Sequence, residues 1–97
     1  MNRFQRALTE KVKEEQPSVA IKPHRQGGIQ KVYSFKNGWG ASVVMFPGSY
    51  GFEEGKWELA VLDCNEEICY TTPIAQDVIG HLDEAGVEKI LERIKKL

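Results

Sequence analysis

The sequence predicts an α+β domain: an antiparallel four- to five-stranded meander with an N-terminal helix and C-terminal helices packed on the sheet. Short stretches of alternating apolar and polar residues are joined by turn-forming residues, which is typical of successive antiparallel strands. Apolar residues recur at helical spacing at both ends of the chain. With 97 residues, 41% hydrophobic and 28% charged, residues 1–97 are expected to form a single soluble domain.

The first expected element is a helix over residues 3–15. Asn2 is a suitable cap, and Gln16 precedes Pro17, which ends the helix because a residue before proline avoids helical geometry. Spacings of three and four residues align one apolar stripe: Phe4, Ala7, Leu8 and Val12. This stripe indicates a helix that packs against the sheet.

Two strands are expected next, over residues 18–23 and 29–36, joined by a glycine-containing turn. Pro23 either places the first strand at an edge of the sheet or ends that strand, because proline cannot donate a ladder hydrogen bond. Asn37 and Gly38 then predict a type I′ hairpin turn into a strand over 39–46, because both turn positions of that type favour such residues.

Residues 56–62 form the clearest predicted strand, after a glycine-rich loop over 47–55. Trp57, Leu59 and Val61 alternate on one face of it and are expected in the core. A turn at residues 63–66 leads to a returning strand over 67–71.

The remaining elements are expected to be helical. Thr72 and Pro73 are typical of a helix start, which predicts a short helix over 73–79 that stops at Gly80. Asp83 then caps a longer helix over 84–96. Its apolar stripe is formed by Val87, Ile90, Leu91, Ile94 and Leu97.

Charge is unevenly distributed although the net charge is only −1. No acidic residue lies between Glu15 and Glu53, whereas residues 53–67 hold six acids and one base, Lys56. This distribution fits a domain with a basic and an acidic side. It equally fits neighbouring strands with complementary charges that pair across the sheet.

Catalysis, cofactors and metals are not expected. His24 and His81 are the only histidines, and nothing in the spacing places either beside a nucleophile or an acid. Cys64 and Cys69 are too few for a zinc site. They are expected to be thiols rather than a disulfide, because the N-terminus has no secretory signal and the expected location is the cytoplasm. No apolar run is long enough for a membrane span.

Several segments resemble small proteins encoded by bacteriophages and prophages. These segments are NGWGASVV (37–44), SYG (49–51), KWELAV (56–61), TPI (72–74), DVIG (77–80) and LERIKKL (91–97). The resemblance covers about the last two thirds of the chain. It implies a phage-encoded protein that acts in the cytoplasm of a host bacterial cell. It implies no catalytic or binding residue, because those proteins carry no assigned activity.

The leading functional hypothesis is binding to a host or phage protein through the loop over 47–55. Tyr50 and Phe52 lie among glycines, and such aromatic residues suit an interface hot spot. Glu53 and Glu54 beside them would favour a basic partner surface, such as that of a nucleic-acid-handling host or defence enzyme. The alternative for this loop is that both rings cap the core. A homodimer also stays open as the assembly.

The second functional hypothesis is weak nucleic-acid binding by the basic segment 22–36. It would use Lys22, Arg25, Lys31 and Lys36 on phosphates, with Tyr33 and Phe35 available for stacking. The pI near 6.1 argues against a dedicated nucleic-acid binder, and the two aromatic residues alternate as core residues do.

Overall fold

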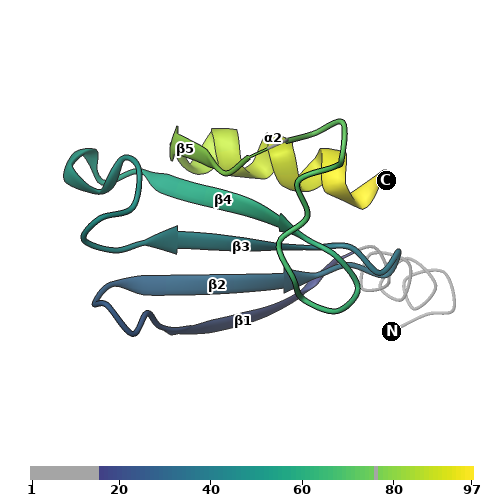
Figure 1. The fold of residues 1–97 in the computed structure, drawn as a ribbon, viewed down its shortest axis with the longest axis horizontal. Coiled ribbons are helices and arrows are strands. Elements are labelled where there is room, and N and C mark those ends of the chain that lie inside the picture. Colours follow the sequence, from purple (N-terminus) through teal and green to yellow (C-terminus); the bar gives the residue numbers. More distant parts are fainter. Residues whose placement is uncertain (1–15, 76) are drawn as a thin grey trace, which may run out of the picture.

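The structure is a computed structural model that describes residues 16–75 and 77–97. Five antiparallel strands follow one another across one sheet in the order β1-β2-β3-β4-β5 (Figure 1). Their bounds are β1 Ser18–Pro23, β2 Ile29–Ser34, β3 Gly40–Met45, β4 Trp57–Leu62 and β5 Ile79–Leu82. A 3-10 helix, η1 (Phe52–Glu54), precedes β4, and an α-helix, α2 (Glu84–Lys95), follows β5. The predicted α+β class and antiparallel meander are confirmed, whereas the helix predicted over 3–15 lies outside the described residues.

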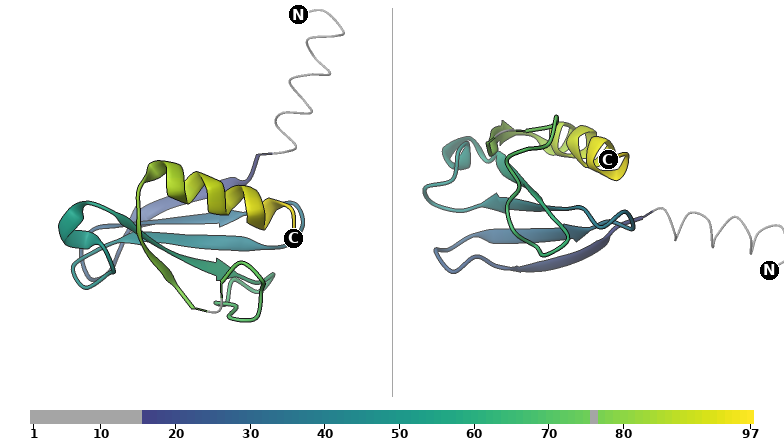
Figure 2. Two further views of the ribbon diagram at one scale, coloured as in Figure 1. Left: turned by 90° about the horizontal axis from the view of Figure 1, so that it is seen from above. Right: turned by 45° about the vertical axis from the view of Figure 1, so that its right-hand side comes forward.

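The two faces of the sheet are covered by different parts of the chain. Helix α2 lies over one face and contacts β3, β4 and β5, while the segment between β4 and β5 crosses the other face at one end (Figures 1 and 2). The core under α2 contains Trp57, Leu59 and Val61, as their alternation predicts. On the opposite face, Val44 and Leu62 are buried.

The turn between β2 and β3 differs from the predicted type I′ turn. Both central residues of a type I′ turn need positive φ, but here only Gly38 has it, at 91°. The Gly38 amide donates to the Phe35 carbonyl at 3.1 Å, and the Phe35 amide donates to the Trp39 carbonyl at 2.8 Å. The hairpin is therefore a three-residue loop with glycine in the left-handed position. This leaves the Asn37 side chain available to contact another element.

The strand predicted over 67–71 and the helix predicted over 73–79 are both wrong. After the turn, only Ile68 forms a bridge, to Leu62, and no strand continues from it. The Thr72 hydroxyl accepts a hydrogen bond from the Ala75 amide at 3.3 Å, but this turn does not continue as a helix. A seven-residue helix gains too few backbone hydrogen bonds to offset its nucleation. Ile79 and the residues after it instead pair with β4 as the fifth strand.

Helix α2 is capped at both ends by side chains. The Asp83 carboxylate accepts from the Gly86 amide at 2.7 Å, which confirms the predicted N-cap. At the other end, the Asn37 amide nitrogen donates to the carbonyls of Ile94 and Lys95 at 2.9 and 3.1 Å. The β2–β3 turn thus adds a side-chain donor to two of the last carbonyls of the helix, of which that of Ile94 also accepts from the Leu97 amide at 3.1 Å.

No helix in the described part of the chain combines the length and the apolar character needed to span a membrane.

Candidate functional site

The loop between β3 and β4 forms a compact structure at one end of the sheet, and we call residues 48–55 the aromatic loop. Its first turn is closed by Ser49, which is buried. The Ser49 hydroxyl donates to the Phe46 carbonyl at 2.8 Å and accepts from the Phe46 amide at 3.0 Å. Both Gly51 and Gly55, which flank η1, have left-handed backbone conformations. The local sequence therefore supplies the turn residues that this loop needs.

The aromatic loop packs directly on the backbone of β5. The His81 amide donates to the Tyr50 carbonyl at 3.3 Å. A Cβ atom on Gly80 would lie 2.3 Å from the Tyr50 Cβ, and one on Gly51 would lie 2.9 Å from the His81 Cα. Glycine at both positions permits this approach, so the backbone of the aromatic loop is held against the sheet.

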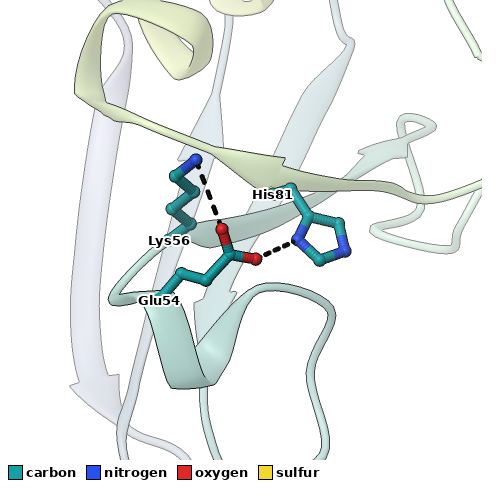
Figure 3. A network of polar contacts seen from close by, with 3 residues as sticks. All are labelled: Glu54, Lys56 and His81. Carbon is teal, nitrogen blue, oxygen red and sulfur yellow. Dashed lines mark hydrogen bonds and ion pairs between the residues drawn. The ribbon is translucent and has the colours of Figure 1, made fainter.

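Strand β5 carries an irregularity at this contact. Trp57 pairs with Leu82 and Leu59 pairs with Ile79, so β5 has one more residue than β4 between the two pairs. His81 lies in this bulge with φ of 56°, a conformation that is uncommon outside glycine. The bulge brings the imidazole to the aromatic loop, as Figure 3 shows.

Glu54 connects His81 and Lys56 in a small polar network (Figure 3). Its Oε1 atom lies 2.7 Å from His81 Nδ1, and its Oε2 atom lies 3.5 Å from Lys56 Nζ. The hydrogen bond from His81, followed by the charge of Lys56, lowers the pKa of the Glu54 carboxyl from its usual value. The network is exposed, so it orients side chains and contributes little to global stability.

The aromatic side chains of the loop point away from the core. Tyr50 is 61% exposed and Phe52 is 36% exposed, and Glu53 and Glu54 are exposed beside them. Together with His81, these four residues line a shallow hollow of about 270 Å³. The structure thus brings all four predicted protein-binding residues to one end of the sheet, and it does not bury the rings in the core.

The His81–Glu54 pair has the composition of two members of a catalytic triad, but the geometry does not supply the third. Ser49 lines the same hollow, yet its buried hydroxyl makes two hydrogen bonds to the Phe46 backbone. A nucleophilic serine instead needs its hydroxyl directed to a general base. The His81–Glu54 contact joins β5 to the aromatic loop.

The four predicted nucleic-acid-binding residues do not gather at one place: two lie near the start of β2, one lies within it and one follows its end. Lys22 and Arg25 line a hollow with His24 at the β1–β2 end. Lys36 follows the other end of β2, about 20 Å away for a six-residue strand. The Lys31 ammonium lies 4.6 Å from the centroid of the Trp57 ring, in a cation–π contact.

The register of the sheet also bears on the uneven charge distribution. Lys22 pairs with Gln30, and Lys31 pairs with Ile21 and Val43. These two bases therefore do not face acidic residues on neighbouring strands, and the cross-strand explanation does not apply to them.

The cysteines and His24 also have defined surroundings in the structure. Cys64 and Cys69 are free thiols. His24 stacks on Phe46 with ring centroids 3.9 Å apart, so the two rings pack together at the β1–β2 turn. Within residues 16–75 and 77–97, no three side chains of the metal-ligating types gather into a group that would hold an ion.

Sequence reasoning missed His81 and Lys56 as members of this site. His81 lies 27 residues from Glu54 in the chain, and the bulge that directs its side chain depends on how β5 pairs with β4. The sequence predicts a helix over 73–79 and no strand after it, so the pairing of β5 with β4 is not expected from the sequence. A glycine before His81 was the one available signal, since glycine within a strand often marks a bulge.

Comparison with known proteins returned no match of this chain to a protein-family model, to a curated protein or to a solved structure.

Proposed function

We propose that this is a non-catalytic, phage-encoded protein that binds a host or phage protein through the aromatic loop. The observation that supports this most strongly is the exposure of Tyr50, at 61%, on a backbone that is held against β5. An aromatic ring on a fixed backbone loses little conformational entropy on binding, while it offers a large contact area. The resemblance to phage proteins supports an activity inside the bacterial host cell.

The charge beside the rings indicates the kind of partner. Glu53 and Glu54 are exposed next to Phe52, and the hollow beside them is open to solvent. Acidic residues at the rim of an interface accelerate association with a basic surface and disfavour acidic partners. A nucleic-acid-handling enzyme of the host, or one of its defence enzymes, presents such a basic surface. The chain would then act as an inhibitor that binds this enzyme through the aromatic loop.

The test compares capture by the wild-type chain and by a variant without the two rings. Tagged wild-type protein, the Y50A/F52A variant and a control variant are incubated with lysate of the host, and bound proteins are identified by mass spectrometry. Y70A/I68A is a matched control because Tyr70 is 50% exposed and Ile68 is also exposed, on a different loop. We expect one stoichiometric protein with the wild type and the control, and none with Y50A/F52A.

Two outcomes contradict the proposal. Equal capture by Y50A/F52A would show that the aromatic loop is not the binding surface. Unfolding of Y50A/F52A, seen as loss of the cooperative thermal transition, would show that the rings are structural.

A nuclease arm separates the nucleic-acid hypothesis from this one. If bound material disappears after nuclease treatment, and if its affinity falls steeply with salt, the basic residues Lys22, Arg25, Lys31 and Lys36 become the candidates. The hollow that Lys22 and Arg25 share is the structural feature that favours this alternative. K22A/R25A should then remove binding while Y50A/F52A retains it.

A further inference from the structure

The β2–β3 turn carries a pair of residues, Asn37 and Gly38, that is prone to a spontaneous chemical change. Asparagine is one of the thermolabile residues, and its deamidation is easiest where glycine follows, because glycine has no side chain to shield its backbone nitrogen. Both residues are exposed, so water and base from the solvent reach them. Asn65, the other asparagine among the described residues, is also exposed but precedes Glu66. The turn is therefore the more reactive of the two places.

Deamidation at this turn would begin at the backbone nitrogen of Gly38. This nitrogen loses its proton to solvent base and attacks the Cγ atom of Asn37. A bond forms between the two atoms, and the side-chain nitrogen leaves as ammonia after it has taken a proton from the solvent. The resulting cyclic succinimide then takes up one water molecule. Opening at one carbonyl gives aspartate at position 37, and opening at the other gives isoaspartate.

The fold keeps the attacking nitrogen engaged. The Gly38 amide donates its proton to the Phe35 carbonyl at 3.1 Å, within the three-residue loop. A proton that is held in such a hydrogen bond is protected from solvent base until the structure opens locally. Attack on Asn37 therefore requires that the turn opens first.

The side chain that would be attacked is held at both of its ends. The Nδ2 atom of Asn37 donates to the carbonyls of Ile94 and Lys95 at 2.9 and 3.1 Å. Its Oδ1 atom accepts from the Trp39 amide at 3.0 Å. These three bonds fix the plane of the side-chain amide, so the Cγ atom is not free to turn toward the Gly38 nitrogen while they persist. Two of the three come from the last turn of α2, and Ile94 lies 57 residues away in the chain.

We propose that Asn37 is a deamidation site and that the last turn of α2 controls its conversion. The hydrogen bonds inside the hairpin open with the hairpin itself, whereas those to the helix persist only while the end of α2 is folded. Ile94 anchors this end, because its side chain is fully buried, at 0% exposed. When the end of the helix frays, as helix ends do, the Asn37 side chain is released and conversion proceeds.

The product cannot restore the contact that is lost. A carboxylate at position 37 offers no donor to the carbonyls of Ile94 and Lys95, and it lies at the negative end of the helix dipole. Isoaspartate also lengthens the main chain of the turn by one carbon atom, which disturbs the loop that closes at Gly38. Each converted molecule thus loses the side-chain link between the β2–β3 hairpin and α2.

The rate of deamidation in the folded and the unfolded chain tests the proposal. The full-length chain is incubated in mildly alkaline buffer with and without urea, and aspartate and isoaspartate at position 37 are quantified by mass spectrometry of proteolytic fragments. Conversion should be slower in the folded chain by on the order of tenfold or more, because several hydrogen bonds must open together. In urea, Asn37 should convert faster than Asn65, which serves as the internal reference.

A pair of matched variants tests the role of the helix end. K95G keeps the backbone carbonyl that accepts from Asn37 but promotes fraying of the last turn, because glycine disfavours helix. We expect it to accelerate conversion in the folded chain by roughly fivefold. K89G is the control, since it makes the same substitution at an exposed position in the middle of α2. It should accelerate conversion less than K95G at a temperature at which circular dichroism shows both variants to be folded.

Three results would overturn the proposal. Equal rates in the folded and the urea-unfolded chain would show that the fold does not protect Asn37. Equal acceleration by K95G and K89G would show that the last turn of α2 does not control the reaction. Conversion of Asn37 in urea that is no faster than that of Asn65 would show that the turn is not a preferred deamidation site.

Discussion

Gly80 is the single residue on which the contact between β5 and the aromatic loop depends most directly. A Cβ atom there would lie 2.3 Å from the Tyr50 Cβ, an atom that cannot move without the backbone. We expect G80A to break the hydrogen bond from the His81 amide to the Tyr50 carbonyl and to lower the free energy of unfolding by roughly 1–3 kcal/mol. Urea denaturation measures the stability, and hydrogen exchange of the His81 amide reports the contact.

The matched control for this substitution is G55A. Gly55 also lies in the loop, at φ of 69°, but a Cβ atom there has no neighbour within 4 Å. G55A should cost about 1 kcal/mol through backbone strain alone and should leave the His81 amide protected. Unchanged protection of that amide in G80A would refute the assigned contact.

Glu54 confers a pH dependence on the polar network of the aromatic loop. Its pKa is lower in the folded protein than its usual value of 4.5, first because His81 donates a hydrogen bond to it and then because of the charge of Lys56. The resulting stabilisation is present above pH 4.5 and is lost as the pH falls through the folded-state pKa. The difference in Tm between wild type and E54Q should therefore shrink as the pH is lowered from 6 to 3. E53Q is the control, and a wild-type–E54Q difference that stays constant over this range would argue against the network.

Asn37 links two elements of the fold, because it joins the β2–β3 hairpin to the end of α2. Its side-chain nitrogen donates to two helix carbonyls, and its side-chain oxygen accepts from the Trp39 amide at 3.0 Å. N37D keeps the acceptor but replaces the donor by a carboxylate oxygen next to those carbonyls. We expect N37D to lower the free energy of unfolding by roughly 1–3 kcal/mol, the range for leaving polar groups unsatisfied.

The control for N37D is a charge change at a nearby exposed position that makes no cap. N65D is this control. The backbone amide of Asn65, and not its side chain, donates the hydrogen bond to Asp63, so the substitution leaves that bond in place. It should change the stability by less than about 0.5 kcal/mol. Equal effects of N37D and N65D in urea denaturation would show that the Asn37 cap contributes nothing beyond charge.

The buried face of α2 joins the helix to the sheet and so unites the domain, and Ile94 lies on this face. Ile94 is fully buried, with an exposed fraction of 0%, in the cluster that contains Leu59 and Val61. I94A should lower the free energy of unfolding by roughly 2–5 kcal/mol, because it removes buried methyl groups and leaves a cavity. A domain of this size has a total stability of roughly 5–15 kcal/mol, so this loss is a large part of it.

Two spectroscopic probes check whether helix and sheet unfold together. Far-UV circular dichroism reports α2, and tryptophan fluorescence reports Trp39 and Trp57, both of which belong to or pack against the core. The indole nitrogen of Trp57 donates to Glu84 at 3.0 Å. Coincident transitions are expected in both wild type and I94A. L97A is the control, since Leu97 is exposed at the chain end. Separate transitions for the two probes would show that α2 is not part of the cooperative core.

Elements that depend on neighbouring residues follow from the sequence alone. Alternation in residues 56–62 predicts β4 and its buried face, and Asp83 with the apolar repeat after it predicts α2. The turn residues between the first four strands predict the antiparallel order. These predictions hold because a period of two or 3.6 residues and a capping side chain act over a few neighbouring positions.

Features that depend on residues distant in the chain follow only from the way in which the segments pack together. Thr72 and Pro73 start a turn but not a helix, because the edge of β4 offers Ile79 and its neighbours hydrogen bonds that a short helix cannot match. The same pairing creates the bulge that brings His81 to Glu54, and Asn37 reaches a helix end more than fifty residues away. Such contacts leave no periodic trace in the sequence, because they arise only when separate segments meet in the folded sheet.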